Sequence, residues 1–289
     1  MRIGTGIYKR KDGRYEARYR KGINSEGKTV LASVYGRTRE EAEAKRAAIT
    51  KKPTLGERLA GINHKQLNLL ILGAGRLAIL LDIPMPESGI CLIDNTTEIL
   101  NECVNDNQYG YGFYSTYINK VVPLVETIIP KIKNRDDFYK IVLFDHIIFN
   151  PDRNAGNLLV QYYKKNILLK VIDHSHVFIN QAIWDANCLE MAMKEKDYFS
   201  TRVLEENKYL YNMFFHNMKP SNNDFSVIKE SICTKLSEEL LRSIILDMPK
   251  EWIPSDKDVD TLIRYILYRI EHIDDICITI LNHLKKGGI

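Results

Sequence analysis

Charge is distributed very unevenly along this chain of 289 residues, and this feature divides the chain into two parts of different character. Residues 1–52 contain 15 Lys and Arg against 6 Asp and Glu, whereas residues 53–289 contain 26 against 31. The modest total of +4 is therefore the sum of a +9 segment and a −5 remainder. We predict a basic module joined to a mildly acidic body, and we expect an anionic partner for the module, most often nucleic acid.

The overall composition, 45% hydrophobic and 27% charged, is typical of a soluble globular protein with a sizeable core. The cysteines are odd in number and include no C-x-x-C pair, which argues against a disulfide framework and a thiolate zinc site: Cys91, Cys103, Cys188, Cys233 and Cys277. The N-terminus has no apolar h-region, and the most apolar stretch, residues 67–75, is far shorter than the ~20 residues of a membrane span. We expect a cytoplasmic protein without a membrane partner.

Residues 1–52 are predicted to form a small sheet followed by a helix. Three β-rich stretches at 3–10, 13–20 and 28–36 are separated by turn residues at 11–13 and 24–27. Thr38 and Glu41 form a capping box that opens a helix through about Ile49. The expected core of this module is Ile7, Ala17, Tyr19, Val34, Ala42 and Ile49. A polar stretch with Pro53 and Gly56 follows, and we take residues 53–75 as a linker or junction.

The body mixes strands and helices. Apolar residues at helical spacing cover 136–149, two strands at 157–162 and 167–173 are joined by a turn at 164–166, and the pattern is helical from about 185. The clearest helix is the last, which Ser255 caps and which carries one apolar stripe from Val259 to Cys277.

The strongest chemical motif is the loop 150–157, with Asp152, Arg153 and Asn157, followed sixteen residues later by Asp173. Phosphoryl transfer needs one carboxylate to orient or deprotonate the acceptor hydroxyl, and an amide oxygen and a second carboxylate to hold the metal. A hairpin would bring Asn157, at the start of one strand, and Asp173, at the end of its partner, close to Asp152. A loop rich in turn-forming residues is the simpler alternative.

These segments, FDHIIFNPDRNAGNLLV and LKVIDHSHVF, resemble the catalytic and metal-binding segments of the HipA-like kinases, over about residues 76–285. The resemblance implies an ATP-dependent Ser/Thr-type kinase, a transferase with a helical C-lobe. It implies that Asp152 is the catalytic base, that Asn157 and Asp173 bind Mg²⁺ and thereby ATP, and that Arg153 supports the loop or the phosphates.

Such a kinase also needs a strand-rich N-lobe with a glycine-containing phosphate loop and a strand lysine. Only about 24 residues, 52–75, precede the resemblance, and Lys65 lies outside any convincing strand, so no nucleotide lysine is assigned. The predicted fold class is α+β: a three-stranded sheet plus helix, then a kinase-like domain (76–289) with a reduced β N-lobe and a mainly helical C-lobe.

Residues 3–50 are similar to the arm-type DNA-binding domain of tyrosine-recombinase integrases from mobile elements. A sheet with tyrosines Tyr8, Tyr15 and Tyr19 among its cations could lie in a DNA groove, with phosphate contacts from Lys9, Arg10, Lys11, Arg14, Arg18, Arg20, Arg37 and Arg39. No R-H-R-Y recombinase set follows. The alternative to a kinase is therefore a non-catalytic DNA-binding or regulatory protein of a mobile element, with the kinase-like body as a scaffold.

Two further motifs compete with this interpretation. Gly73 and Gly75 follow an apolar run in a G-x-G-x-x-A pattern that could begin a dinucleotide site, although close packing is the preferred explanation. His174 and His176, two apart on the predicted strand, together with His146, could hold a hydrolytic metal. We prefer the phosphotransfer role of Asp173, which would point away from both histidines on that strand.

Overall fold

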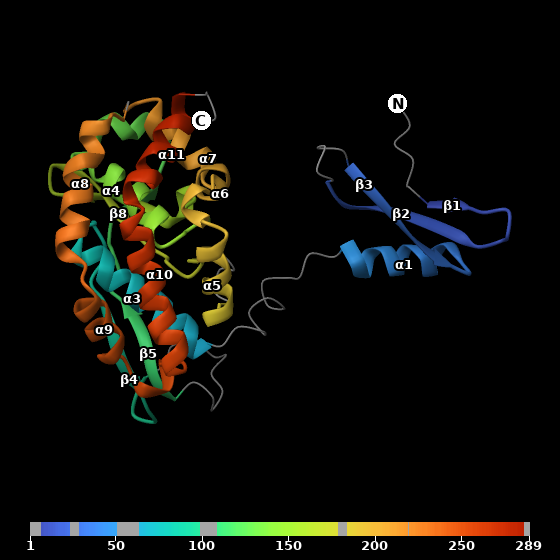
Figure 1. Cartoon of the computed structure of the whole chain (residues 1–289), viewed down its shortest axis with the longest axis horizontal. Helices are drawn as coiled ribbons and strands as arrows, with labels where there is room; N and C mark the ends of the chain where they lie inside the picture. Colours follow the sequence, from blue (N-terminus) through green and yellow to red (C-terminus); the bar gives the residue numbers. More distant parts are fainter. Residues whose placement is uncertain are drawn as a thin grey trace. The chain divides into compact units, whose positions relative to one another are not determined.

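The computed structural model describes residues 7–23, 29–50, 64–98, 109–178, 184–218 and 220–285. The chain divides into two compact units, residues 1–61 and 62–289, and each is described by itself (Figure 1). Both units combine sheet with helix, which confirms the predicted α+β class.

The first unit is an antiparallel sheet in the order β1-β2-β3, formed by β1 (Ile7–Lys9), β2 (Tyr15–Ile23) and β3 (Thr29–Gly36), with α1 (Arg39–Thr50) packed on it. The turn between β1 and β2 requires a left-handed residue, which Gly13 supplies with φ of 83°. The Thr38 side chain accepts a hydrogen bond from Glu41 N (3.1 Å), as the capping box predicts.

Small residues set the spacing between this sheet and α1. Ala17 and Ala42 are fully buried, and a Cβ on Gly36 would lie 2.4 Å from the backbone nitrogen of Ala42. Ile7 and Val34 are half-buried, whereas the side chains of the other two expected core residues, Tyr19 and Ile49, lie outside the described part of the chain.

The second unit begins with α3 (His64–Leu80) and two sheets. Strands β4 (Ser88–Ile93) and β5 (Gly110–Ser115) form an antiparallel pair. The second sheet has the order β6-β7-β8, from β6 (Val121–Pro123), β7 (Leu158–Tyr163) and β8 (Asn166–Val171). Between β6 and β7 the chain forms a 3₁₀ turn, η2 (Glu126–Lys131), the helix α4 (Asp137–Ile147) and a short turn, η3 (Ala155–Asn157).

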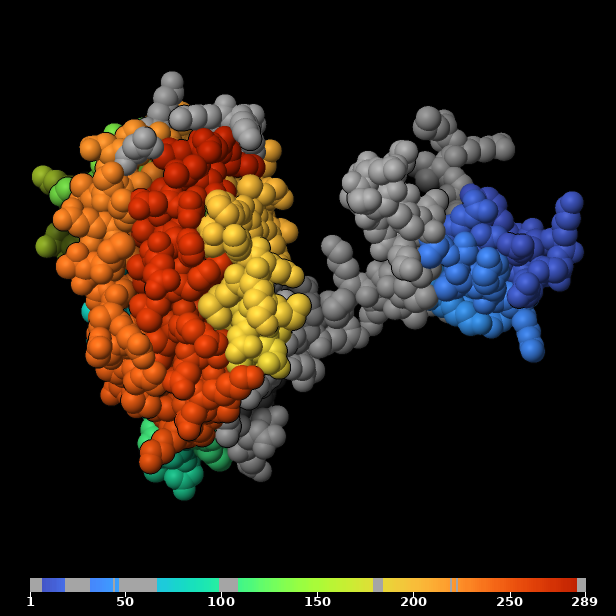
Figure 2. Space-filling model, in the orientation of Figure 1, coloured from blue at the N-terminus to red at the C-terminus, as the bar shows by residue number. Residues whose placement is uncertain are grey.

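The remainder of the second unit is helical. Figure 2 shows α10 and α11 as a red band over one face, between α8 and α9 in orange and α5 to α7 in yellow. The elements are α5 (Ala186–Lys194), η4 (Asp197–Phe199), α6 (Arg202–Glu206), α7 (Lys208–Phe215), α8 (Asn222–Lys235), α9 (Glu238–Leu246), η5 (Lys250–Trp252), α10 (Asp256–Glu271) and α11 (Ile273–Lys285).

Helix α4 runs through the hydrophobic core, and this burial determines what its polar residues must do. Phe138 stacks on Phe214 of α7 with ring centroids 3.7 Å apart, and both rings are fully buried. Asp145 and His146 lie in the same core, at 0% and 2% exposure. Because a buried polar group without a partner is costly, these two side chains require partners inside the protein.

The structure resolves the ambiguous glycine motif. Residues 67–72 belong to the single helix α3, which continues through Gly73 and Gly75, so the strand and turn of a dinucleotide site are not formed there. A Cβ on Gly73 would contact Met248 and one on Gly75 would contact Met85, both at 3.4 Å. These are ordinary van der Waals distances to flexible methionine ends, so the packing against α3 does not require glycine at either position, and the helix forms no turn there.

The prediction of one continuous last helix is wrong, because the structure has two helices there. Ser255 caps α10 by accepting from Asp258 N, as expected, but the apolar stripe is divided between α10 and α11 at His272. The His272 ring stacks on Tyr198 with centroids 3.8 Å apart and its Nδ1 lies 3.2 Å from the Asp275 carboxylate. These side-chain contacts coincide with the break, and the apolar pattern alone does not register them.

Candidate active site

The candidate site is built on the loop that follows α4. Phe149 adopts a left-handed conformation (φ 47°), which ends the helix, and Asp152 N donates to Asn150 Oδ1 (3.1 Å). The Asn154 side chain accepts from Gly156 N (2.8 Å) and so caps the short turn that leads into β7. Asn157, at the end of that turn, donates through Nδ2 to the backbone oxygen of Asp152 (2.8 Å). Local hydrogen bonds thus fix the loop that carries Asp152 and Asn157.

Asp173 lies in a second loop, beside the first. Strand β8 ends at Val171, and Ile172 N donates to Asn157 O (3.0 Å), which places Asp173 next to the Asn157 turn. Asp173 is exposed and has φ of 58°, and its Oδ1 accepts from both the backbone nitrogen (2.9 Å) and the hydroxyl (2.5 Å) of Ser175.

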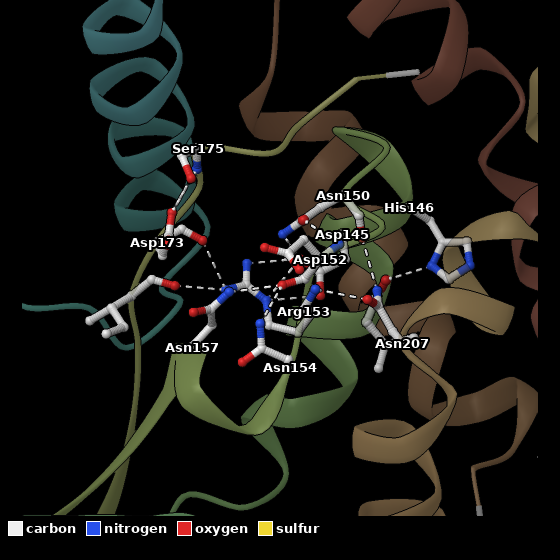
Figure 3. A network of polar contacts seen from close by, with 12 residues as sticks. Asp145, His146, Asn150, Asp152, Arg153, Asn154, Asn157, Asp173, Ser175 and Asn207 are labelled. Carbon is white, nitrogen blue, oxygen red and sulfur yellow. Dashed lines mark hydrogen bonds and ion pairs between the residues drawn. The ribbon is translucent and has the colours of Figure 1, made fainter. Parts of the chain in front are cut away.

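A chain of polar contacts connects the two loops at the surface. The Ser175 hydroxyl lies 2.8 Å from His176 Nδ1, and that nitrogen lies 3.5 Å from Asp152 Oδ2. The side chains of Asp152 and His176 are 41% and 34% exposed, so solvent reaches this cluster. The structure therefore brings Asp152, Asn157 and Asp173 into one neighbourhood, as Figure 3 shows. The contacts through Ser175 and His176 connect the two carboxylates.

Arg153 joins the same loops from beneath. Its side chain is fully buried and forms an ion pair with Asp145 (2.9 Å), which is also fully buried. Its Nη1 donates to the backbone oxygens of Ile172 (2.8 Å) and Asp173 (3.3 Å), as Figure 3 shows. Of the two roles expected for Arg153, support of the loop agrees with this geometry, whereas a fully buried guanidinium does not reach phosphates in solvent.

Two residues that the sequence did not indicate complete this buried network. Asn207 accepts from Arg153 N (2.7 Å) and donates to Asn150 O (2.9 Å), so it holds the loop on both sides of Asp152. Tyr211 donates its hydroxyl to Asp145 Oδ2 (3.2 Å). Both follow the loop by fifty residues or more, and no local sequence signal connects them to it.

Burial determines the charge states beneath the site. Burial raises the pKa of Asp145, against the opposing effects of Arg153 and of hydrogen bonds from Asn150 and Tyr211. Burial lowers the pKa of His146 to about 3, and burial together with the Arg153 charge holds the pKa of His174 well below its ordinary range. Both histidines are therefore neutral near pH 7.

The geometry does not support the histidine-metal alternative. His174 and His176 do not lie on a strand, because β8 ends at Val171 and Asp173 is left-handed, so the predicted alternation of faces is wrong. His174 and His146 are buried, whereas His176 contacts Asp152. Within the described residues, no group of three or more His, Cys, Asp or Glu is arranged to hold a metal ion.

The first unit has a second candidate site on the sheet face opposite α1. Glu16 lies at its centre and accepts from Arg10 (2.8 Å), Arg18 (2.9 Å) and the Ser33 hydroxyl (2.7 Å). Its side chain is only 9% exposed, and the hydrogen bonds, that from Arg18 first, lower the pKa of Glu16 to about 2. The acid is therefore ionised and holds two of the predicted DNA-binding arginines in place.

Tyrosines support these arginines. The Arg18 guanidinium lies 5.3 Å from the ring centre of Tyr8, and those of Arg10 and Arg14 lie 5.4 Å from that of Tyr35. Tyr35 and Glu16 were absent from the predicted interface, and Tyr15 is half-buried. Of the other predicted residues, Lys9 lies over the Tyr15 ring and Lys11 is in the β1-β2 turn. Arg37 and Arg39 are exposed near the start of α1. The side chains of Arg20 and Tyr19 are outside the described part of the chain.

Comparison with known proteins gives the class of the second unit. The HipA-like kinase family matches residues 63–276, about three quarters of the chain. The chain therefore belongs to the HipA-like kinases, and membership of a kinase family implies the use of ATP. The match covers the loops of Asp152 and Asp173 and leaves the basic unit outside.

Two individual proteins are also similar to the chain. The proinflammatory kinase CtkA of Helicobacter pylori has a TM-score of 0.47 and 12% identity, over 76% of this chain and 83% of that one. A gamma-glutamyl phosphate reductase of Brachyspira hyodysenteriae is 22% identical over 227 residues, which are 72% of this chain and 48% of the reductase. The chain thus spans about half the length of that curated relative.

No helix in the described ranges is both long and apolar enough to cross a membrane.

Proposed function

We propose that the second unit transfers the γ-phosphoryl group of ATP to a Ser or Thr hydroxyl of a protein. The observation that carries this proposal is the pairing of two loops, one with Asp152 and Asn157 and the other with Asp173, by the single buried residue Arg153. Catalysis of phosphoryl transfer consists mainly of positioning and electrostatic stabilisation. A rigid support beneath the three polar residues is what such a reaction requires.

Each residue has a distinct role in this proposal. Asp152, partly exposed at the loop surface, orients the acceptor hydroxyl and takes its proton. Asn157 uses its amide nitrogen to hold Asp152 O, which leaves its amide oxygen for a cation, and Asp173 supplies a carboxylate. Oxygen ligands of this kind suit Mg²⁺, and the residues present therefore fit it. The metal, when bound, neutralises charge on the phosphates.

Magnesium-dependent ATP hydrolysis and autophosphorylation test this assignment. Asp152→Ala and Asp173→Asn are each expected to reduce the rate by roughly 10²-fold or more, which is the usual range for loss of general acid-base or charge-stabilising groups. Asp136→Asn, which removes a carboxylate of 84% exposure at the start of α4, is the matched control and leaves the rate unchanged. Equal rates in all four proteins would contradict the site assignment.

For residues 1–52 we propose DNA binding through the sheet face that carries Arg10, Arg14 and Arg18. The support is the concentration of cations held over tyrosines on one exposed face, together with the +9 charge of this segment. The whole chain would then be a DNA-tethered kinase. Arginines already ordered over rings lose less conformational freedom on binding a phosphate or a base edge.

DNA affinity of the full chain, measured at several salt concentrations, tests this second proposal. Arg18→Ala is expected to weaken binding and to reduce the salt slope by about one unit, as loss of one phosphate contact does. Lys131→Ala is the control, because Lys131 is an exposed lysine of the second unit, outside residues 1–52. Affinity that does not change with salt would exclude the basic sheet as the binding surface. The two proposals can fail separately. Kinase activity without DNA binding would support only the first proposal. DNA binding without kinase activity would support the alternative of a non-catalytic regulator of a mobile element.

We place this activity in the cytoplasm, where thiols stay reduced. Cys91, Cys188, Cys233 and Cys277 are all free, which agrees with that compartment, and Cys103 lies outside the described residues.

A further inference from the structure

A groove of about 530 Å³ opens at the tip of the β7-β8 hairpin, apart from the candidate active site. Its walls are residues 85–87 before β4, the connection 116–120 between β5 and β6, and residues 161–164 and Lys170 of the hairpin. The hairpin pairs Leu158 with Val171 at its base, beside Asn157 and Asp173, and Tyr163 with Asn166 at its tip. At about 3.3 Å per residue, the five steps from Leu158 to Tyr163 place the hairpin tip roughly 17 Å from the active-site end. The groove extends from this tip along the strands as far as Lys170, which pairs with Leu159 near the base.

Hydrogen bonds between the walls give this groove a fixed shape. Tyr162 N donates to Lys120 O (3.0 Å) and Gln161 Nε2 lies 3.4 Å from Asn119 O, so the connection 116–120 is tied to β7. Lys170 Nζ lies 3.3 Å from Met85 O, which ties β8 to the opposite wall. A groove formed before its ligand arrives costs little to order on binding.

The charge of the groove differs from that of the unit around it. Lys120, Lys164 and Lys170 line it with one carboxylate, Glu87, whereas residues 53–289 as a whole carry −5. The excess of cations therefore belongs to this place and not to the body in general. It favours a ligand with a few negative charges.

The backbone at two of these lysines is strained. Lys120 has φ of 59° and Lys164 has φ of 55°, a left-handed conformation that Gly or Asn adopts at lower cost. Turn formation therefore does not explain why lysine stands at both positions. Strain of this kind concentrates at ligand-binding sites, where the side chain is needed despite its conformational cost.

Aromatic side chains complete the lining. Tyr117 is 82% exposed and Tyr162 and Tyr163 are 42% and 50% exposed, while Lys164 Nζ lies 5.2 Å from the Tyr163 ring centre. Tyrosine is enriched in protein-protein interfaces, because the ring supplies contact area and the hydroxyl a hydrogen bond. An excess of only two positive charges suits a short run of Asp or Glu better than a polyanion.

We propose that this groove binds an acidic peptide segment of a partner protein, with Lys120 and Lys164 contacting its carboxylates and the three tyrosines its apolar and amide groups. The binding does not depend on phosphoryl transfer. Where the kinase activity also holds, the groove retains the protein substrate at a distance from the reacting hydroxyl and thereby selects it.

Fluorescence anisotropy of the full chain with a short labelled peptide of alternating Glu and Tyr tests the proposal. Lys164→Glu is expected to weaken binding about tenfold or more, because it places like charges together. Lys165→Glu is a matched control: it makes the same charge change in the same turn, but Lys165 is exposed and does not line the groove. We expect less than about a twofold effect there, as for rim charges generally.

Three outcomes would overturn the proposal. They are equal effects of the two substitutions, equal binding of a peptide in which Gln replaces Glu, and displacement of the peptide by a single-stranded oligonucleotide at lower concentration than by the unlabelled peptide. Asp152→Ala keeps full peptide binding if the groove acts on its own. Loss of kinase activity and loss of peptide binding are therefore separate results.

Discussion

Replacement of Arg153 by methionine tests whether the buried network really supports the active-site loops. The change removes the ion pair with Asp145 and the hydrogen bonds to Ile172 O and Asp173 O, and both members of the pair are 0% exposed. Removal of one partner from a buried ion pair typically costs 3–5 kcal/mol, because the other charge remains buried. We expect Arg153→Met to lower the free energy of unfolding by about 3–5 kcal/mol on this basis.

The pH dependence of that loss follows from the carboxyl group left behind. Burial already raises the pKa of Asp145, and loss of Arg153 removes the main effect that opposes it. A folded state that keeps a proton above the unfolded carboxyl pKa of about 3.9 loses stability as pH rises, by at most about 1.4 kcal/mol per pH unit. The difference between Arg153→Met and wild type is therefore expected to be larger at pH 8 than at pH 5.

Urea denaturation followed by tryptophan fluorescence measures these free energies for the second unit alone, because both tryptophans, Trp184 and Trp252, are buried there. Combining Asp145→Leu with Arg153→Met replaces the pair by apolar side chains and should recover much of the loss. Arg264→Met, at an exposed pair with Glu190 (3.2 Å), is the control and costs less than about 1 kcal/mol. A similar small cost for Arg153→Met would refute the argument.

Three further predictions concern other parts of the chain. Because burial lowers the pKa of His146 to about 3 from 6.5, stability is lost as pH falls below 6.5. Between pH 6.5 and 5, wild type should lose about 1.6 kcal/mol more than His146→Gln in urea titrations. Glu16→Gln should weaken DNA binding in anisotropy measurements although it removes a negative charge, because Glu16 orients two arginines, and tighter binding would contradict that role. Gly73→Ala should raise the thermal stability of α3, by about 0.5–1 kcal/mol, whereas Gly36→Ala should lower that of the first unit, since its Cβ would lie 2.4 Å from Ala42 N; calorimetry distinguishes the signs.

Features that depend on neighbouring residues were predictable from the sequence. Strand alternation, the Thr38 and Ser255 caps and the turn at Gly13 each arise within a few residues of the chain, and each is present. The sequence likewise predicted that Asp152 and Asn157 lie in a turn that leads into a strand, and the turn and β7 are both present there.

Features that depend on packing between distant segments were not predictable. Asn207 reaches Arg153 only because α7 packs beside α4, and the sequence holds no local trace of that contact. The same applies to Tyr35, which lies on the arginine face because of its pairing opposite Glu16. The prediction that Asp173 and the histidines His174 and His176 point to opposite faces of one strand was wrong, because the left-handed Asp173 interrupts the strand pattern.

The left-handed backbone at Asp173 has a consequence for how this site can change during evolution. The conformation is required by the loop, whether or not the carboxylate is used, and it is adopted readily only by Gly, Asn and Asp. A relative that has lost the carboxylate but kept this loop conformation is therefore expected to carry Asn or Gly at position 173, and not Val or Ile. Val or Ile at that position would indicate that the loop itself has changed conformation.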